Sequence, residues 1–506
     1  MTQSYRTLND ALLHNAAEFG GAAALLLPRG TRSHGLSGES INWNDLAEWV
    51  TFLAAELTGR MTPGERLIHV VSNSVDDVLI ALACQAAGIV EIPVDAEGGE
   101  DYVDSCRRRV DARWFDGNAK RDLIDRAKHR RIHFAGPNIG VLPSVAPKDD
   151  ALILWTSGTS GEPKGVVLSH ESLLANALAK LDAVGQRRTD RRLTVLSIAH
   201  AYARTCDLNT WLLSGCTLAI TRGFQGWQEW ARDVTPTLCN TVPSLADRII
   251  DGGVMPRTLR ILGCGGAAMS GEQFAHWRDH GVTVIQGYGL TEAGPVVASQ
   301  SPEDSIAGRV GRFVTGWEYR LGGVDLPKNV PGQESMNSGF GRHVDGEGRL
   351  FVRGRHVMSR YWDDAESTSR RVDRDGWLDT GDVVRVCQSS GQLEILGRCD
   401  DRIILSNGHS VDPGAVERRI SGVIGLQTAV LVAGADGRSL ELWVEADDDR
   451  FSQSELRSAL IGLPAWEQPG SIHFFQIPDS VRDRVFNRKG AVRRGEMLRF
   501  LRSPEL

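Results

Sequence analysis

Residues 152–170 read LILWTSGTSGEPKGVVLSH, an apolar stretch that runs into a turn rich in glycine and hydroxyl side chains. The turn residues are Thr156, Ser157, Gly158, Thr159, Ser160 and Gly161, and Lys164 follows them. Glycines let backbone N–H groups turn toward an anion, hydroxyls add donors, and a lysine adds a point charge. The pattern does not match the Walker loop GxxxxGK[ST], and a flexible Ser/Gly turn is the alternative. The ordered run, with Pro-Lys-Gly after it, favours a phosphate-binding loop.

Helix-like and strand-like segments alternate on both sides of this loop. Residues 41–57 show apolar side chains at helical spacing, with Asn44 or Asp45 placed to cap the helix. Residues 65–71 and 89–94 read as buried strands, and the helical stretch between them ends at Gly88. The strand-like stretches LRILGCGGA (259–267) and VTVIQGYG (282–289) each run into glycines. The alternation predicts an α/β fold with a parallel sheet, whose ligands bind outside the carboxyl ends of the strands.

The later part of the chain changes character. Over residues 305–397, frequent glycines punctuate short strands such as RLFVRG (349–354), which indicates a β-rich subdomain. The chain has 506 residues, too many for one core, since hydrophobic cores stop growing at roughly 250–300 residues. We place a domain boundary near Asp400, with an N-terminal domain over 1–397, a linking segment over 398–402 and a C-terminal domain over 403–506.

Composition and charge argue against several classes of protein. The net charge of −7 and a pI of about 6.0 are unlike those of a dedicated nucleic-acid binder. The sequence has no run of about 20 apolar residues that could span a membrane, and its first residues do not resemble a secretory signal. The eight cysteines are scattered without a CxxC pair, which is typical of reduced thiols. We expect a cytoplasmic protein whose partners are neither nucleic acid nor membrane.

Further motifs follow the loop in order: GCGGAAMS (263–270), QGYGLTEAG (286–294), GWLDTGD (376–382) and GRCDDRIILSNGHSVDPGAVE (397–417). With TSGTSGEPKG (156–165), they make the chain resemble the adenylate-forming enzymes, and most of all the acyl-CoA synthetases. This superfamily includes acyl- and aryl-CoA ligases, peptide-synthetase adenylation domains and beetle luciferase. The resemblance implies a large N-terminal domain of parallel-sheet α/β subdomains with a β-rich subdomain, and a small mobile α+β C-terminal domain. It also implies that ATP and Mg²⁺ activate a carboxylic acid to an acyl-AMP, whose acyl group passes to a thiol, usually that of coenzyme A.

The resemblance assigns nucleotide contacts to residues in these motifs. Tyr288 would stack on the adenine and Thr291 would contact the α-phosphate. Glu292 would hold Mg²⁺ together with Thr159, because a hard cation prefers oxygen ligands. The other contacts implied near the strand ends are Gly265, Gly266, Ala267, Gln286, Gly287 and Gly289.

Two further nucleotide contacts are implied later in the chain. Asp382 would accept hydrogen bonds from both ribose hydroxyls, and Arg398 would reach the ribose or the phosphates. Asp379, in the same motif as Asp382, corresponds to a position of structural use.

The resemblance also implies residues for the acid and the thiol. His200 falls where acyl-CoA ligases carry a histidine or an aromatic residue near the carboxylate. The Phe-Asp-x-Ser element of peptide synthetases is not found, because Asp207 lies too near Gly215, so we expect an acid other than an amino acid. Asp400 matches the hinge about which the C-terminal domain would rotate. One face of that domain would bring a catalytic lysine, and the other would bring Gly408 beside the coenzyme A tunnel.

The region of the expected catalytic lysine departs from the family pattern. That pattern is Pro-x-Thr-x-x-Gly-Lys-[Ile/Val]-x-Arg, whereas residues 482–494 read RDRVFNRKGAVRR. Lys489 is the only lysine after Lys328, so it is the candidate, but Arg488 replaces the glycine and Arg493 lies one position too far along. The lysine stabilises charge that develops during adenylation, and small positioning errors there are costly.

Three hypotheses therefore stay open. The chain is a complete ligase that converts a small-molecule carboxylic acid through acyl-AMP to an acyl-CoA. Alternatively, it performs only thioester formation and takes acyl-AMP from a partner adenylating enzyme. In the third hypothesis it is a catalytically inactive relative that binds nucleotide. A carrier-protein thiol could replace coenzyme A, and the sequence leaves the acid and the oligomeric state open.

Overall fold

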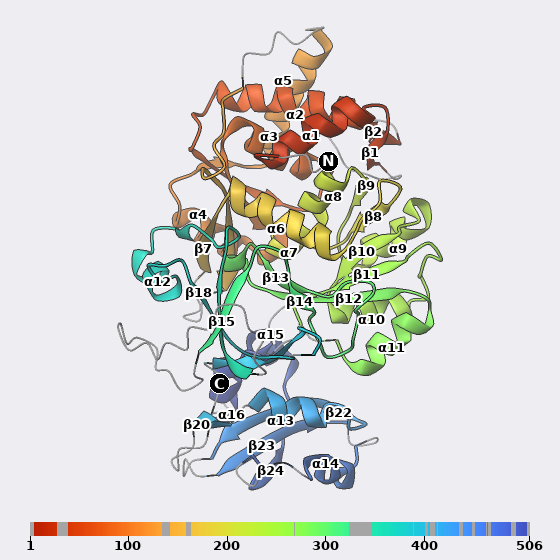
Figure 1. The fold of residues 1–506 in the computed structure, drawn as a ribbon, viewed down its shortest axis with the longest axis vertical. Coiled ribbons are helices and arrows are strands. Elements are labelled where there is room, and N and C mark those ends of the chain that lie inside the picture. The colour runs from red at the N-terminus through yellow and green to blue at the C-terminus, as the bar shows by residue number, and fades with distance from the viewer. Residues whose placement is uncertain are drawn as a thin grey trace. The chain divides into compact units, whose positions relative to one another are not determined.

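The computed structural model describes most of the chain and divides it into two compact units. Unit one comprises residues 1–319 and 352–378, and unit two comprises residues 320–351 and 379–506 (Figure 1). The described residues are 5–27, 39–133, 142–157, 163–267, 269–322, 346–387, 389–399, 403–404, 410–411, 413–434, 439–447, 451–461, 463, 467–486 and 492–502. The predicted boundary over 398–402 stays a prediction, and Asp400 lies outside the described residues.

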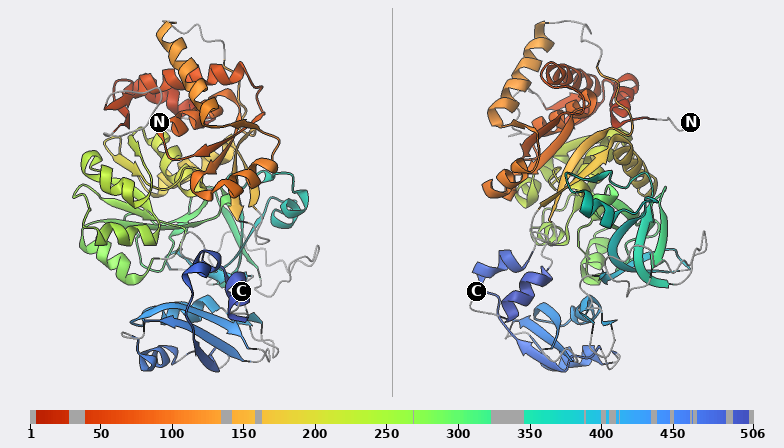
Figure 2. Two further views of the ribbon diagram at one scale, coloured as in Figure 1. Left: turned by 180° about the vertical axis from the view of Figure 1, so that it is seen from behind. Right: turned by 90° about the vertical axis from the view of Figure 1, so that its left-hand side faces the viewer.

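Unit one contains a nine-stranded sheet. Its strand order is β14 (Arg312–Phe313), β13 (Val296–Ser299), β12 (Thr283–Gly289), β11 (Ile261–Cys264), β10 (Leu238–Thr241), β8 (Arg191–Thr194), β9 (Thr217–Ile220), β1 (Ala23–Leu26) and β2 (Ser40–Asn42). The strands from β12 to β1 pair in parallel, and the strands outside them pair antiparallel. Helices α9 (Gly223–Val234), α10 (Pro243–Asp251) and α11 (Gly271–Asp279) lie beside this sheet (Figures 1 and 2).

A six-stranded sheet in the same unit carries the predicted phosphate loop. Its order is β17 (Arg360–Tyr361), β7 (Pro163–Ser169), β6 (Asp150–Ser157), β4 (Val90–Asp95), β3 (Arg66–Val71) and β5 (Arg113–Phe115). Strands β5, β3, β4 and β6 are parallel, whereas β6, β7 and β17 pair antiparallel. The predicted loop therefore joins the two strands of a hairpin.

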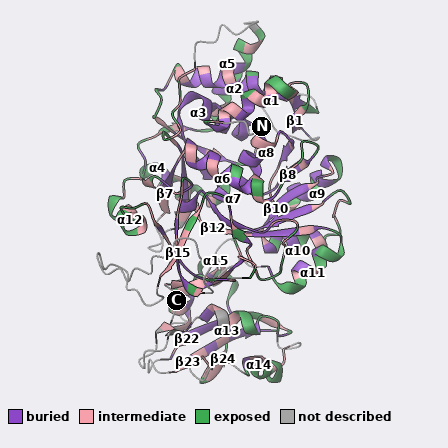
Figure 3. Cartoon of the chain, in the orientation of Figure 1, coloured by how far each residue is buried: buried purple, intermediate pink, exposed green. Residues whose placement is uncertain are grey.

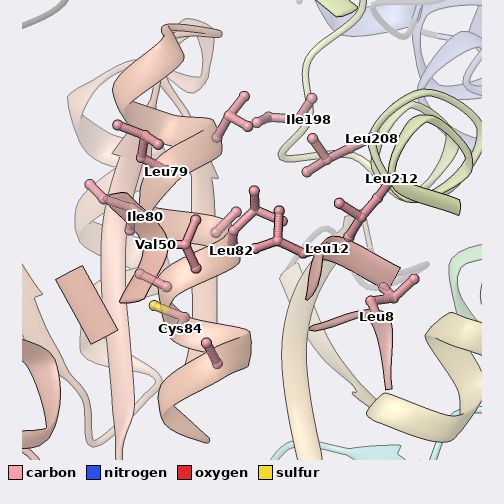
Figure 4. Close-up of a cluster of buried hydrophobic side chains, with 14 of the residues drawn as sticks. Leu8, Leu12, Val50, Leu79, Ile80, Leu82, Cys84, Ile198, Leu208 and Leu212 are labelled. Atoms are coloured by element: carbon pink, nitrogen blue, oxygen red, sulfur yellow. The ribbon is translucent and has the colours of Figure 1, made fainter. Parts of the chain in front are cut away.

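Helix α3 (Val75–Ala87) shows how local sequence shapes the core. Ser74 and Asp77 form a capping box at its start, and Gly88 ends it with a φ of 67°, a left-handed conformation that glycine adopts without strain. Every residue of the helix is buried. It packs with α1 (Leu8–Phe19) and α2 (Trp43–Thr58), so the helices form one apolar cluster (Figures 3 and 4). The predicted helix end at Gly88 is confirmed.

The remaining helical segments of unit one connect the strands. They are η1 (Ala96–Gly98), α4 (Glu100–Arg108), α5 (Gly117–His133), α6 (His170–Ala183), α7 (Ala201–Ala203), the π-helical segment η2 (Arg204–Asn209), α8 (Thr210–Ser214), η3 (Thr291–Ala293) and α12 (Ala365–Arg371). The predicted cap of α2 was wrong: Asn42, not Asn44 or Asp45, accepts a hydrogen bond from the Asp45 N–H at 2.8 Å. The helix begins earlier because β2 ends at Asn42.

Unit two is built from shorter strands. A four-stranded sheet, most of it in this unit, has the order β15 (Glu318–Gly322), β16 (Gly346–Arg353), β18 (Leu378–Val386) and β19 (Leu393–Arg398). A second sheet contains β22 (Leu426–Ala433), β23 (Leu440–Ala446) and β24 (Ser471–Phe474), and β20 (Ile403–Ile404) pairs with β21 (Ser410–Val411). Helices α13 (Pro413–Ile420), α14 (Gln453–Leu460), α15 (Asp479–Val485) and α16 (Arg494–Arg502) complete the unit.

Alternation along β22 explains the two apolar clusters of unit two. Leu431 packs with side chains of α13 and α14, whereas Val430 and Val432 pack with those of α15 and α16. Successive side chains of a strand point to opposite faces, so the sheet buries both of its faces. The predicted α/β fold class is confirmed. Within the described part of the chain, no helix is both long enough and apolar enough to cross a bilayer.

Candidate functional site

The hairpin of β6 and β7 brings the two ends of the predicted phosphate loop together. Thr156 lies opposite Lys164 and Ser157 lies opposite Pro163 in its register. The Thr156 hydroxyl is 3.4 Å from the carbonyl oxygen of Lys164. Gly158, Thr159, Ser160 and Gly161 lie outside the described residues. Thr156 and Lys164 thus lie opposite each other at the two ends of the segment that is predicted to bind phosphate.

Lys164 and Glu292 meet at one tyrosine. Lys164 Nζ is 5.2 Å from the ring centroid of Tyr361 and donates to Ser367 Oγ at 2.6 Å. The Tyr361 hydroxyl donates to Glu292 Oε1 at 2.6 Å. Asp364 Oδ2 lies 3.6 Å from Lys164 Nζ. The tertiary structure therefore brings a cation of the loop and a carboxylate of the QGYGLTEAG motif to the same place.

Tyr361 is a residue that the sequence did not single out. It reaches the loop because β17 pairs with β7, where Tyr361 lies opposite Val166. Burial, then the neighbouring Glu292 carboxylate, raises the pKa of Tyr361 far above its ordinary value. The phenol therefore stays protonated and acts as a donor to Glu292. Tyr361 reaches Glu292 because β17 pairs with β7, and no motif of the sequence marks the residues of β17 as functional.

Glu292 is suited to holding Mg²⁺ in the way the family implies. Tyr361 binds Oε1, which leaves Oε2 for a cation. Among the described residues, no group of three or more His, Cys, Asp or Glu could hold a metal ion by itself. Mg²⁺ in nucleotide enzymes is commonly bound through one or two carboxylates, substrate phosphates and water, so a single carboxylate fits. The other predicted ligand, Thr159, lies outside the described residues.

β11 and β12 are neighbouring parallel strands of the large sheet, so their carboxyl ends point in the same direction. Cys264 pairs with Gln286 in parallel register, so Gly265, the first residue after β11, is level with Gly287, which still lies within β12 and pairs with Ser299 of β13. A Cβ atom on Gly265 would lie 3.0 Å from the Tyr202 ring, so a larger residue here would require that ring to shift. Of the other predicted residues in this region, Gly266 and Gly289 are exposed, Ala267, Tyr288 and Thr291 are half-buried, and Gln286 is buried.

His200 lies near the carboxyl end of β11, as the contact of its neighbour Tyr202 shows. It is the cap residue before α7, and Tyr202, two residues later, packs against Gly265. His200 Nε2 is 2.9 Å from Asp95 Oδ2, and the His200 side chain remains 53% exposed. The predicted acid-binding histidine is thus accessible and close to the strand ends where ligands of α/β sheets bind.

Asp382 and Arg398 lie in unit two and pair with each other. They face each other across β18 and β19, and Arg398 Nη1 donates to Asp382 Oδ1 at 3.0 Å. The Asp382 side chain is 7% exposed and that of Arg398 is 39% exposed. Asp379 instead accepts from Arg349 Nε at 2.9 Å and from the Gly381 N–H at 2.9 Å, which supports its structural reading.

Asp400, Gly408 and Lys489 lie outside the described residues. The hinge, the coenzyme A contact and the catalytic lysine therefore stay predictions.

Comparison with known proteins agrees with this fold and these motifs. The family model for AMP-binding enzymes matches residues 12–362, more than half of the chain. The chain is 27% identical over 486 residues to a feruloyl-CoA synthase of Amycolatopsis sp, covering 90% of this chain and 94% of that protein. It is 29% identical over 314 residues to an indoleacetate–CoA ligase of Aromatoleum aromaticum, covering 60% and 57% of the two chains.

Solved structures show the same fold over nearly the whole chain. ATP-bound MatB from Rhodopseudomonas palustris superimposes with a TM-score of 0.78 at 21% identity, covering 98% of this chain and 99% of that one. O-succinylbenzoate coenzyme A synthetase (MenE) from Bacillus subtilis, in complex with AMP, gives a TM-score of 0.74 at 18% identity, covering 96% and 97%. The chain belongs to the AMP-binding enzyme family, which is the adenylate-forming superfamily that its motifs resemble.

Proposed function

We propose that this enzyme is an acyl-CoA ligase that converts a carboxylic acid other than an amino acid, by way of an acyl-AMP, to an acyl-CoA. The observation that carries the proposal is the meeting of Lys164 and Glu292 at Tyr361, beside the hairpin of the phosphate loop. An ammonium group and a carboxylate that can hold Mg²⁺ are what a triphosphate requires. Relatives with similar sequences are a feruloyl-CoA synthase, an indoleacetate–CoA ligase and a malonate–CoA ligase.

The surroundings of Asp207 support an acid without an α-amine. Asp207 is fully buried, and its Oδ1 accepts hydrogen bonds from Arg192 and from Asn240 Nδ2, the latter at 2.7 Å. Because Asp207 is closed to solvent, a substrate ammonium group could reach its carboxylate only if the surrounding core opened. Asp207, the candidate for the amine-binding aspartate of peptide synthetases, is therefore already paired with Arg192 and Asn240.

In this proposal, residues of the chain bind and orient the nucleotide. Lys164 would neutralise phosphate charge, with Ser367 and Asp364 orienting its ammonium group. Tyr361 would hold the Glu292 carboxylate toward Mg²⁺, which would shield the phosphates when bound. Tyr288 would stack on adenine, and Asp382 would accept from the ribose hydroxyls, with Arg398 bound to the same carboxylate.

Separate assays of the two half-reactions test the proposal. The first measures pyrophosphate released from ATP, Mg²⁺ and one acid without a thiol, using ferulate, 4-coumarate, indoleacetate, malonate and a long-chain fatty acid. The second measures thioester formed from a synthetic acyl-AMP and coenzyme A. A complete ligase gives both products with the same acid. Loss of pyrophosphate release in Tyr361→Phe, with the fold retained, would support the role of the tyrosine.

A second candidate, thioester formation alone, is favoured by the altered sequence around Lys489. In that case the second assay gives product and the first gives none with any acid, and Lys489→Ala leaves the second rate unchanged. The acyl-AMP would then come from a partner adenylating enzyme. Nucleotide binding without either product would instead indicate the inactive relative.

A further inference from the structure

A buried carboxylate at the carboxyl end of β4 contacts His200. Asp95, the last residue of β4, is 4% exposed, and its Oδ2 lies 2.9 Å from His200 Nε2. Its Oδ1 accepts from Arg222 and from the Glu97 N–H, the latter at 2.9 Å. Burial opposes ionisation, but the hydrogen bonds from His200 and Arg222 outweigh it and hold the pKa of Asp95 well below its ordinary value. Asp95 is therefore a carboxylate throughout the neutral range.

An ionised carboxylate can only accept hydrogen bonds. The proton between His200 and Asp95 must therefore sit on Nε2 of the imidazole. In the neutral ring this leaves Nδ1 as the nitrogen with an available lone pair. The tautomer of His200 is thus decided by its partner rather than by the ring itself.

Side chains of Asn73 and Arg204 hold the backbone just before His200 in place. Asn73 Oδ1 accepts from the Ile198 N–H at 3.0 Å, and Arg204 Nε donates to the Ile198 carbonyl at 3.0 Å. Asn73 Nδ2 also donates to the Leu196 carbonyl at 2.7 Å. With the main chain held, the remaining freedom at His200 is the rotation and tautomer of its ring. The hydrogen bond to Asp95 restricts both the rotation and the tautomer.

We infer that Asp95 is a positioning residue that fixes His200 as the Nε2–H tautomer and presents Nδ1 to the bound acid. This inference rests on the proposed function and on the place near the acid's carboxylate that the family resemblance gives to His200. Without Asp95, the half-exposed ring could flip or exchange its proton between the two nitrogens. The hydrogen bond made by one nitrogen of an imidazole sets which nitrogen carries the proton, so replacing that partner changes what the other nitrogen can do. Neither Asp95 nor Arg222 belongs to any motif of the sequence.

The first test reads the tautomer directly and needs no substrate. NMR of the full chain labelled with ¹⁵N-histidine, at alkaline pH, reports which ring nitrogen carries the proton, and His200→Gln assigns the signal. We expect His200 to carry a proton on Nε2, alone or together with Nδ1. In Asp95→Asn we expect a shift toward the Nδ1–H form or a mixture, because an amide can donate to Nε2. A wild-type ring protonated on Nδ1 alone would overturn the inference.

The second test uses the acid that gives pyrophosphate release in the panel above. Asp95→Asn should lower kcat/KM for the acid by about tenfold, with little change in KM for ATP. Asp95→Glu should recover part of the loss because it restores an acceptor. Glu97→Gln is the matched control: Glu97 Oε1 accepts from Arg222 Nε at 2.7 Å, but its side chain is 66% exposed, so the activity of this variant should match wild type.

A double-mutant cycle separates positioning from general damage. In a His200→Gln background, adding Asp95→Asn should change kcat/KM by less than about twofold, since nothing remains to position. An equal tenfold loss in both backgrounds would overturn the inference. Absence of product from every acid would contradict the proposed ligase activity instead, and the NMR result would still decide the role of Asp95.

Discussion

Two buried carboxylates bind arginines around the π-helical segment η2, yet their ionisation shifts in opposite directions. Glu91 accepts from Arg204 Nη1 and Nη2, both at 2.8 Å, and its Oε1 lies 3.0 Å from His69 Nε2. Burial opposes its ionisation, but Arg204 and His69 outweigh burial and lower its pKa to about 2. Both carboxylate oxygens thus have partners, and the charge is well compensated.

Asp207, three residues after Arg204, is equally buried but less well paired. Arg192 and Asn240 both donate to Oδ1, whereas Oδ2 has no hydrogen-bond partner among the described residues. Here burial prevails over Arg192 and raises the pKa to about 6. Whether a buried carboxylate ionises therefore depends on how many of its oxygen lone pairs accept hydrogen bonds, and not only on the presence of an arginine.

Removing the arginine of the better pair should have the largest effect. Arg204→Met leaves the Glu91 charge buried without its main partner and should lower the free energy of unfolding by about 3–5 kcal/mol. Denaturant titration measures the loss. Arg126→Met is the control: this arginine is 60% exposed and pairs with Asp122, so the change should cost at most about 0.5 kcal/mol. Similar losses in both variants would contradict the view that Arg204 compensates Glu91.

Crowding the partner of the weaker pair should have an intermediate effect. A Cβ on Gly263 would lie 1.9 Å from Asn240 Oδ1, so Gly263→Ala must displace the amide that donates to Asp207. We expect a loss of about 1–3 kcal/mol in the free energy of unfolding. Gly185→Ala, where a Cβ would meet no atom within 4 Å, is the matched control and should be near neutral. A neutral Gly263→Ala would show that Asn240 can move without cost.

Asp382 and Arg398 extend the comparison to a pair whose arginine is 39% exposed. In the proposed function this carboxylate accepts from the ribose, so Asp382→Ala should weaken AMP binding by about 1–3 kcal/mol, measured by calorimetry. Arg385→Ala changes an exposed ion pair on the same strand and should leave AMP affinity unchanged. Unchanged affinity in Asp382→Ala would count against the ribose role.

The pH dependence of stability tests the two carboxylates of the comparison separately. The pKa of Asp207 in the folded state, about 6, exceeds its ordinary 3.8, so its contribution is present below pH 3.8 and is lost as pH rises through 6. The pKa of Glu91, about 2, lies below its ordinary 4.5, so its contribution is present above pH 4.5 and is lost as pH falls through 2. Asp207→Asn should flatten the first window and Glu91→Gln the second, in denaturation midpoints across pH. The reverse assignment would contradict the comparison.

The candidate site was only partly predictable. Thr156, Lys164, Gly265 and Glu292 were named from motifs, and the structure connects Lys164 to Glu292. Tyr361, which makes that connection, was missed because its hydroxyl acts on a residue 69 positions away through a strand pairing. Asp95 was missed for the same reason, since it serves His200 across two different elements.

By itself, the sequence determined the local features: the α/β alternation, the end of the α3 helix at Gly88, and the strands that run into glycines. These depend on side-chain periodicity and on conformational limits that act over a few residues. Only the tertiary structure decided which charges meet. Arg204 and Glu91 are 113 residues apart, and their pairing follows from the packing of whole strands and helices around them. Local sequence cannot specify such contacts, because burial and partner geometry exist only once the chain has folded.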